Sequence, residues 1–169
     1  MKEALKRFGR FSGVRRRLLS TLVAGGGFAA LGSARKTRAA VDDLRFPGDP
    51  AEHKVVYQFN KGEPSYHEHV LFSVGAVLRQ YGDNVQIVVT CFAEGIHVLA
   101  KEPLRPVAEQ VQARVRSLAH YGVEFHACRN TMKSLNWTEE DLVPFAKVVE
   151  VGAADLMELQ EQGFGYISW

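Results

Sequence analysis

The segment Val85–Phe92 (VQIVVTCF) constrains the fold of this chain more than any other stretch of its sequence. Its residues are mostly apolar and β-branched, which favours a β-strand. Because successive side chains of a strand point to opposite sides, both faces of this strand must be buried. Strands of this kind are typical of parallel sheets that helices cover on both sides.

Strands and helices alternate along the rest of the domain. Short β-branched or aromatic runs predict further strands at Lys54–Phe59, Val123–Ala127, Lys147–Val151 and Tyr166–Ile167. Helical spacing predicts helices from Ser65 to Tyr81, from Pro106 to just before Gly122, over Asn130–Leu135 and over Ala153–Gln162, with short helical turns at Gly95–Ala100 and after Thr138. The pair Ser65 and Glu68 has the pattern of a capping box at the start of the first helix.

Helices between successive strands imply right-handed crossovers and therefore a parallel arrangement. We expect an α/β fold, namely a three-layer sandwich with a mostly parallel sheet of about five strands and helices on both faces.

The first 39 residues differ sharply in charge from the rest. They hold ten Lys and Arg against one Glu, whereas residues 40–169 hold eleven basic and eighteen acidic residues. Basic residues that include Arg15, Arg16 and Arg17 precede the weakly apolar, glycine-rich stretch Leu18–Ala34. This order resembles a twin-arginine signal peptide.

The sequence thus predicts a signal peptide at 1–39, a linker at 40–53 and an α/β domain at 54–169. We expect periplasmic localisation, with membrane contact only during export. An uncleaved membrane anchor or an N-terminal helix of the fold remain alternatives for Leu18–Ala34. The acidic domain argues against nucleic acid as a partner, because affinity for phosphates requires Lys and Arg on the binding face.

Polar and reactive side chains gather after three of the predicted strands. The segments are Asn60–His69, Cys91–His97 and Cys128–Thr131, and they contain both cysteines of the chain. In an open parallel sheet, the functional crevice lies beyond the carboxyl ends of the strands. We therefore expect these three segments to meet at one edge of the sheet.

Cys128 is the strongest candidate in this set. It ends a strand and precedes a short helix that starts near Asn130, so helix N–H groups can stabilise its thiolate. Arg129 adds positive charge beside it. Strand parity places Glu124, His126 and Cys128 on one face, which makes His126 a candidate neighbour. The alternative is a buried cysteine that acts as a small apolar residue.

Cys91 is a candidate redox partner for Cys128. If their strands are neighbours, the two residues lie at adjacent strand ends, about 5 Å apart between backbones. That separation suits a disulfide, and an oxidising compartment favours one. A structural bridge, a redox pair and two free thiols all remain open.

The histidines invite a metal interpretation that their spacing does not support. His67 and His69 are two residues apart on a helix and point to different sides, and neither His97 nor His126 completes a known ligand pattern. We expect these histidines to belong to ordinary polar surface and the chain to hold no metal or other cofactor.

The segment Gly122–Met132 (GVEFHACRNTM) resembles the cysteine-containing segment of the DsrE/DsrF-like sulfur-relay family, which has the form G-V-x-F-x-x-C-x-N-T. Val151–Ala153 and Leu159–Ile167 are similar to the ending of the family, and Phe92–Gly95 matches its layout after a strand. The resemblance extends over about residues 53–169.

The resemblance implies a trimer or hexamer of identical chains in which Cys128 carries a covalent persulfide. We therefore expect an exported sulfur carrier or sulfur-relay component, closer to a sulfurtransferase partner than to a turnover enzyme, that exchanges sulfur with a donor or acceptor protein. The alternative is a non-catalytic module of the same fold that binds a small ligand or metal or serves in assembly.

Overall fold

The computed structural model describes residues 48–169. The predicted signal peptide and its cleavage site therefore lie outside the described residues, as does the first part of the predicted linker. Within 48–169, no helix is both long enough and apolar enough to cross a membrane.

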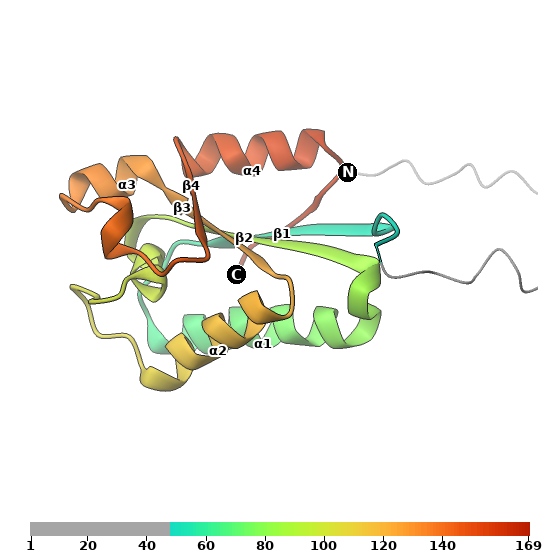
Figure 1. Ribbon diagram of the computed structural model, residues 1–169, viewed down its shortest axis with the longest axis horizontal. Helices are drawn as coiled ribbons and strands as arrows, with labels where there is room; N and C mark the ends of the chain where they lie inside the picture. The colour runs from blue at the N-terminus through green and yellow to red at the C-terminus, as the bar shows by residue number, and fades with distance from the viewer. Residues whose placement is uncertain (1–47) are drawn as a thin grey trace, which may run out of the picture. The chain divides into compact units, whose positions relative to one another are not determined.

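A parallel sheet forms the centre of the domain (Figure 1). Its five strands lie in the order β4-β3-β2-β1-β5, and every pair of neighbours is parallel. The strands are β1 (His53–Phe59), β2 (Val85–Cys91), β3 (Glu124–Cys128), β4 (Ala146–Val149) and β5 (Gly165–Ile167). The predicted α/β class is confirmed.

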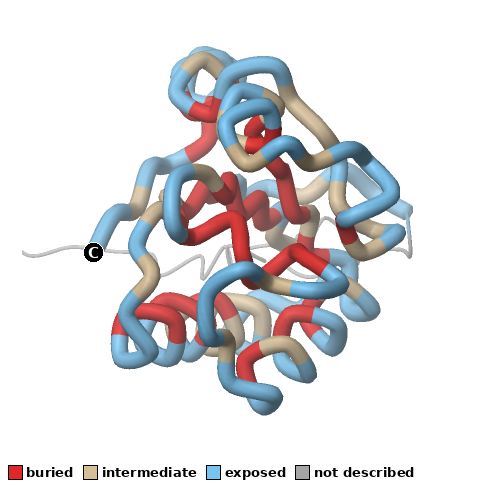
Figure 2. The backbone as a smooth tube through the Cα atoms, turned by 90° about the vertical axis from the view of Figure 1, so that its left-hand side faces the viewer, coloured by how far each residue is buried: buried red, intermediate tan, exposed pale blue. Residues whose placement is uncertain are grey.

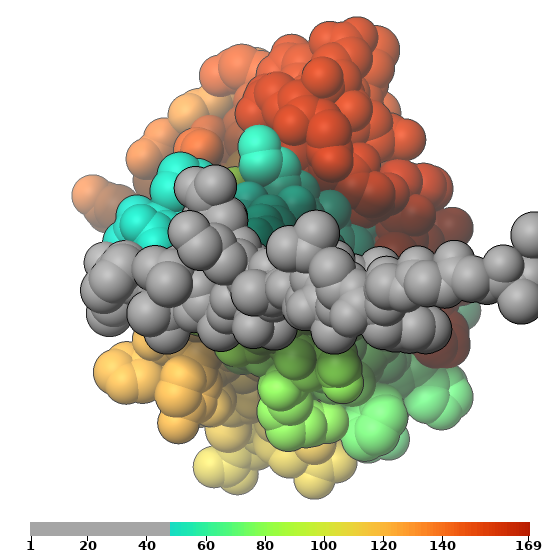
Figure 3. Space-filling model, turned by 90° about the vertical axis from the view of Figure 1, so that its right-hand side faces the viewer, coloured from blue at the N-terminus to red at the C-terminus, as the bar shows by residue number. Residues whose placement is uncertain are grey.

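Helices cover both faces of the sheet. The longer ones are α1 (Pro64–Tyr81), α2 (Glu109–His120) and α4 (Gly152–Glu161), and α3 (Arg129–Ser134) is a short helix after β3. In Figure 1, α1 and α2 lie below the sheet and α3 and α4 above it. Figure 3, seen from the end where the strands begin, shows the C-terminal residues in red opposite the green and yellow residues of α1 and α2.

The strand order explains the positions of α1, α2 and α4. The chain moves in one direction across the sheet from β1 to β2 to β3, so right-handed crossovers place α1 and α2 on the same face. The connection from β4 returns across the whole sheet to β5, so the same handedness places α4 on the opposite face.

The apolar core lies mainly between the sheet and the α1/α2 pair. That cluster includes large buried side chains such as Tyr57, Phe59, Leu71 and Phe125. The cluster under α4 is much smaller and consists of Val56, Val88, Leu156, Leu159 and Phe164, with Phe92 packed against it. Figure 2, which views the carboxyl ends of the strands, shows the buried segments in the centre and the exposed segments around them.

Some local predictions were wrong. The capping box at Ser65 and Glu68 does not form, because α1 begins one residue earlier at Pro64, whose missing N–H suits the first helical position. A capping box is present instead at Thr138 and Asp141, around the 3₁₀ turn η3 (Glu139–Asp141). Helix α2 begins at Glu109 rather than at Pro106, since the backbone of Ala108 is still extended. The turn predicted at Gly95–Ala100 is the 3₁₀ segment η2 (Ala93–Leu99).

Candidate thiol site

Cys128 lies where two neighbouring strands give way to helices. It is the last residue of β3 and the N-cap of α3, and the adjacent strand β4 leads into α4 at Gly152. The thiol therefore faces the N-terminal ends of two helices, whose first N–H groups have no partner within the helix.

Backbone N–H groups of both helices hydrogen-bond the thiol. The Gly152 N–H donates to Cys128 Sγ over 3.2 Å, and the N–H groups of Thr131 and Asn130 and the Thr131 hydroxyl also interact with the sulfur. Burial alone would raise the pKa of Cys128, but these donors outweigh it and lower the pKa below its ordinary value. The arrangement favours a thiolate.

The same packing covers the sulfur. Cys128 is only 5% exposed, and a Cβ atom at Gly152 would stand 3.1 Å from Phe92 Cδ1 and 3.3 Å from Cys128 Cβ. Glycine at position 152 thus permits this close approach, whereas its φ angle does not require a glycine. A reacting sulfur would reach Cys128 only after a small local movement of these neighbours.

Thr131 links the loop after β3 to the loop after β2. Its Oγ1 accepts a hydrogen bond from the Ala93 N–H over 3.1 Å, and its hydroxyl also interacts with Cys128. Ala93 has a φ of 48°, a left-handed conformation at the start of η2. The predicted meeting of these segments at one edge of the sheet therefore includes a direct bond beside the thiol.

Arg129 is directed toward carboxylates. Its Nε lies 2.7 Å from Glu150 Oε1 and its Nη2 lies 2.9 Å from Glu139 Oε1. These contacts tie α3 to η3 and to the loop after β4. The N–H of Asn130 also donates to the Glu150 carbonyl over 3.3 Å. Arg129 thus fixes the surroundings of the thiol, with its charge largely balanced by two acidic side chains.

His126 lies on the same face of β3 as Cys128 but binds Asp155 of α4. Its Nδ1 is 2.9 Å from both carboxylate oxygens of Asp155, and the Thr90 hydroxyl donates to Asp155 Oδ2 over 2.7 Å. The other ring nitrogen, Nε2, lies 3.6 Å from Glu124 Oε2. Nδ1 of His126 is therefore bound to a carboxylate, whereas its buried Nε2 has no hydrogen-bond partner among the described residues. The sequence suggested the thiol as the neighbour of this ring.

The surroundings of Asp155 lower its pKa. Burial by itself would raise the pKa of Asp155, but hydrogen bonds from His126 and Thr90, together with the electrostatic effect of the nearby His126 and Lys147 side chains, lower it. A buried carboxylate with two hydrogen-bonding partners stands between α4 and the sheet.

Cys91 is separated from Cys128 by the sheet itself. In the β2–β3 register, Cys91 pairs with Ala127, so Cys128 lies one residue further along and points to the opposite face. Both cysteines are free thiols in the structure, which is one of the three possibilities that the sequence left open. Cys91 is fully buried in the α1/α2 core, where burial raises the pKa of its thiol.

Three of the histidines predicted to lie at the surface are buried. The His67 ring stacks on Phe59 and its Nε2 bonds the Lys61 carbonyl oxygen. The His97 ring packs edge-on against Trp137. His126 is buried against Asp155. In the described part of the chain, no three His, Cys, Asp or Glu side chains are placed to hold a metal ion.

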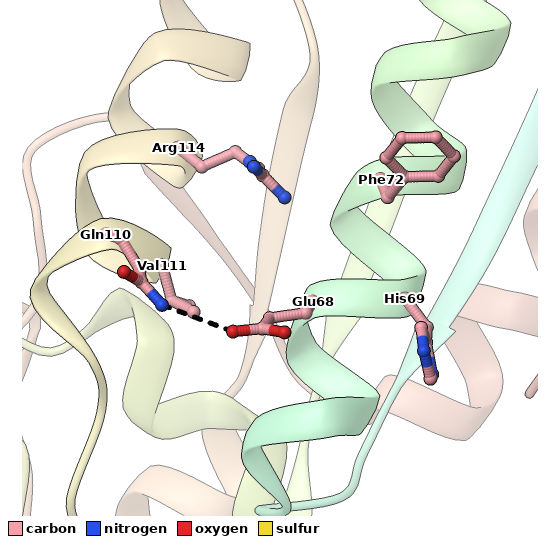
Figure 4. A pocket seen from close by; sticks show the side chains of 6 residues that line it. All are labelled: Glu68, His69, Phe72, Gln110, Val111 and Arg114. Atoms are coloured by element: carbon pink, nitrogen blue, oxygen red, sulfur yellow. Dashed lines mark hydrogen bonds between the residues drawn. The ribbon is translucent and has the colours of Figure 1, made fainter.

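A separate surface pocket of about 430 Å³ lies between α1 and α2. Figure 4 shows Glu68, His69 and Phe72 on α1 and Gln110 and Arg114 on α2, with a hydrogen bond from Gln110 to Glu68. Most of these side chains are exposed, and the pocket has none of the residues that surround Cys128.

Comparison with known proteins places the chain in a family. The model of the DsrE/DsrF-like family matches residues 53–169, and the chain belongs to that family. This membership indicates sulfur relay at the level of the family. No curated protein matches the chain.

Solved structures share its fold. A protein of unknown function from Methanobacterium thermoautotrophicum, MTH1491, is similar with a TM-score of 0.63 and 24% identity, over 70% of this chain and all of that one. The ychN protein of E. coli is similar with a TM-score of 0.57 and 12% identity, over 69% of this chain and 99% of that one. A conserved protein of unknown function from Bacteroides thetaiotaomicron, BT1422, has a TM-score of 0.50 and 14% identity, over 69% of this chain and 94% of that one.

Several residues of the site had no role in the sequence interpretation. They are Thr90, Thr131, Gly152 and Asp155. Gly152 and Thr131 both fall in the segments that carry the family resemblance, which is a usable signal for them. Asp155 had no such signal, because its role depends on where α4 crosses the sheet.

Proposed function

We propose that this chain is an exported sulfur carrier of the DsrE/DsrF-like family and that Cys128 holds a persulfide. Family membership supports sulfur relay in general. The observation that carries the proposal for this residue is the set of N–H donors around Cys128 Sγ, led by Gly152 over 3.2 Å. A thiolate is the form of cysteine that attacks sulfur.

The proposed reaction exchanges one sulfur–sulfur bond for another. The Cys128 thiolate attacks the outer sulfur of a donor persulfide, the donor sulfur–sulfur bond breaks, and the donor leaves as a thiolate that takes up a proton from solvent. Cys128 then carries the outer sulfur as a persulfide. In the second transfer, an acceptor thiolate attacks that outer sulfur and releases the Cys128 thiolate. No external oxidant or reductant is consumed in either step.

The partners in this proposal are a sulfur donor and a sulfur acceptor protein, and the chain itself assembles as a homo-trimer or homo-hexamer. The family resemblance supports this assembly. Native mass spectrometry of the purified domain distinguishes a trimer or hexamer from a monomer, and a monomer at all concentrations tested would contradict this part.

Periplasmic localisation is the remaining part of the proposal, and it rests on the charge and apolar pattern of residues 1–39. Substitution of Arg15 and Arg16 by Lys in the full-length chain should retain the protein in the cytoplasmic fraction. Unchanged fractionation after this substitution would show that a twin-arginine route is not used.

Intact-mass analysis tests the persulfide. After incubation with a low-molecular-weight persulfide, the wild-type domain should gain the mass of one sulfur atom and lose it on treatment with a reductant. Cys128→Ser should gain nothing, whereas Cys91→Ser should behave like the wild type. A wild-type protein that gains no sulfur, or a Cys128→Ser variant that does, would overturn the proposal.

A further inference from the structure

The first turn of α4 is attached to the sheet in an unusual way. The buried residues of α4 are Gly152, Asp155, Leu156 and Leu159. Gly152 has no side chain, and both leucines follow Asp155 along the helix. Asp155 is therefore the side chain that connects the beginning of α4 to the strands beneath it.

Its carboxylate bridges two strands at once. Thr90 of β2 and His126 of β3 are register partners on the same face of the sheet, and both hydrogen-bond Asp155 over 2.7–2.9 Å. Lys147 of β4 is the next partner of His126 in the register, and Glu124 lies 3.6 Å from the far nitrogen of His126. The carboxylate thus has hydrogen-bonding partners on two neighbouring strands.

This attachment acts on the same helical turn that binds the thiol. Asp155 lies three residues after Gly152, whose N–H donates to Cys128 Sγ, and the Asp155 N–H bonds the Val151 carbonyl oxygen over 3.0 Å. Because an N–H···S hydrogen bond weakens steeply with distance and angle, a small shift of this turn would remove it. The apolar contacts under α4 lie mainly along its later residues.

We propose that Asp155, held by His126 and Thr90, is a positioning residue that sets the reactivity of Cys128 by keeping the Gly152 N–H aimed at the thiol. The inference rests on the proposed function, since it concerns the group that would accept sulfur. The proposal gives a role to the buried network of Asp155, His126 and Thr90. Among the hydrogen bonds of the described residues, none joins these three side chains to Cys128 Sγ, so the network acts on the thiol through the helix turn.

The sign of the effect separates this role from simple electrostatics. A negative charge near Cys128 disfavours its thiolate, so removing the Asp155 charge alone would lower the thiol pKa. Loss of the Gly152 hydrogen bond would instead raise it. A purely structural role would reduce stability and leave the thiol pKa unchanged.

The experiment measures the alkylation rate of Cys128 against pH in the folded domain, with peptide mapping to locate the label. We expect Asp155→Ala to raise the thiol pKa by about one unit, the order expected for one lost hydrogen bond to a charged group. Asp155→Asn keeps one acceptor oxygen, so it should raise the thiol pKa less than Asp155→Ala does. Leu156→Ala is the matched control, because it removes an apolar anchor of the same helix and should leave the thiol pKa unchanged.

An unchanged or lowered thiol pKa in Asp155→Ala would overturn the positioning role, as would an equal rise in Leu156→Ala. If Asp155→Ala does not fold, Thr90→Val removes only one bond of the network, and the same criteria apply to it. A wild-type Cys128 that titrates as an ordinary thiol would overturn the proposed function together with this inference. A low pKa in the wild type that persists in the variants would overturn the inference alone.

Discussion

The two faces of the sheet are built by different means. The α1/α2 face is a large apolar cluster that contains several aromatic and aliphatic side chains. The α4 face has a small apolar cluster and, beside it, a buried carboxylate with hydrogen-bonding partners on two strands. The first face supplies most of the apolar burial, whereas the second places polar groups at defined positions.

The two cysteines show what this difference does to one kind of side chain. Cys91 and Cys128 end neighbouring strands and point to opposite faces. Burial raises the pKa of Cys91, and N–H donors lower the pKa of Cys128. The two cysteines thus lie at nearly the same level of the sheet edge. The face of the sheet to which each thiol points decides whether its pKa is raised or lowered.

The largest expected contrast is in stability. Leu71 of α1 is 1% exposed and Leu156 of α4 is 7% exposed, and they face opposite sides of the sheet. We expect Leu71→Ala to lower the free energy of unfolding by about 3–4 kcal/mol and Leu156→Ala by about 2 kcal/mol, because a larger packed cluster leaves a larger cavity. Urea unfolding of both variants measures the difference. Equal losses would show that the two faces contribute alike.

The sequence predicted the layered fold because its signals are local. Val85–Phe92 is apolar on both sides and short, which already requires a covered parallel sheet. The strand order was not predictable in the same way. The position of β5 beside β1 depends on a crossover over the whole sheet, and no local pattern records that choice. The start of α1 was also missed, since Ser65 offered a plausible cap one residue inside the true helix.

The second contrast exchanges the two sulfurs for hydroxyls. Cys91→Ser places a hydroxyl in an apolar core, where the existing Sγ is 3.8 Å from the Val89 carbonyl oxygen. We expect a loss of about 1–3 kcal/mol in the free energy of unfolding with unchanged alkylation of Cys128. Cys128→Ser should abolish alkylation at this site, because the thiol is gone. It should lower the free energy of unfolding less than Cys91→Ser does, because the serine hydroxyl still accepts the hydrogen bond of the Gly152 N–H.

Unfolding curves and peptide-mapped alkylation of both variants provide the measurement. The comparison fails if Cys91→Ser slows the alkylation of Cys128, since the two faces would then be coupled. It also fails if Cys128→Ser is the less stable variant, since the α4 face would then depend on the sulfur for its packing.

The sequence predicted the part of the site that lies along strand β3, but not the part that neighbouring strands contribute. Strand parity places His126 and Cys128 on one face, and the boundary between strand and helix predicts N–H donors near the sulfur. The sequence did not reveal which strands lie side by side, or in which register. Which strand lies beside β3 decides that Gly152 donates to the thiol, and the register decides that Cys91 points away from it.

The third contrast uses two glycines. A Cβ at Gly152 would meet Phe92 and Cys128 at 3.1–3.3 Å, so Gly152→Ala should displace its N–H and raise the pKa of Cys128 by up to about one unit. Gly75 lies within α1 on the other face, and a Cβ there would come no closer than 3.4 Å, to an Arg79 nitrogen. Gly75→Ala should stabilise α1 by about 0.5–1 kcal/mol and leave the thiol unchanged. The alkylation rate against pH and urea unfolding test both variants. If the thiol pKa changes in both variants, or in neither, the close packing at Gly152 is not what sets it.

The smallest contrast is in the response to acid. Burial lowers the pKa of His67 and of His97, which pack against Phe59 and Trp137 of the α1/α2 core. The unfolded chain therefore binds more protons than the folded one below about pH 6.5, the ordinary histidine pKa. Stability should fall as pH drops through this value, by up to about 1 kcal/mol per pH unit for each histidine. Asp155 has a lowered pKa, so its contribution is present above the ordinary carboxyl pKa of about 4 and is lost only below it.

Urea unfolding between pH 7 and pH 4 therefore separates the two faces. His67→Gln should flatten the decline between about pH 6.5 and pH 5, because a glutamine side chain takes up no proton there. Asp155→Asn should lower stability throughout this range without removing the decline due to His67 and His97. If instead Asp155→Asn abolishes the decline and His67→Gln leaves it intact, the acid response belongs to the α4 face, and burial of the two histidines in the larger core is not its cause.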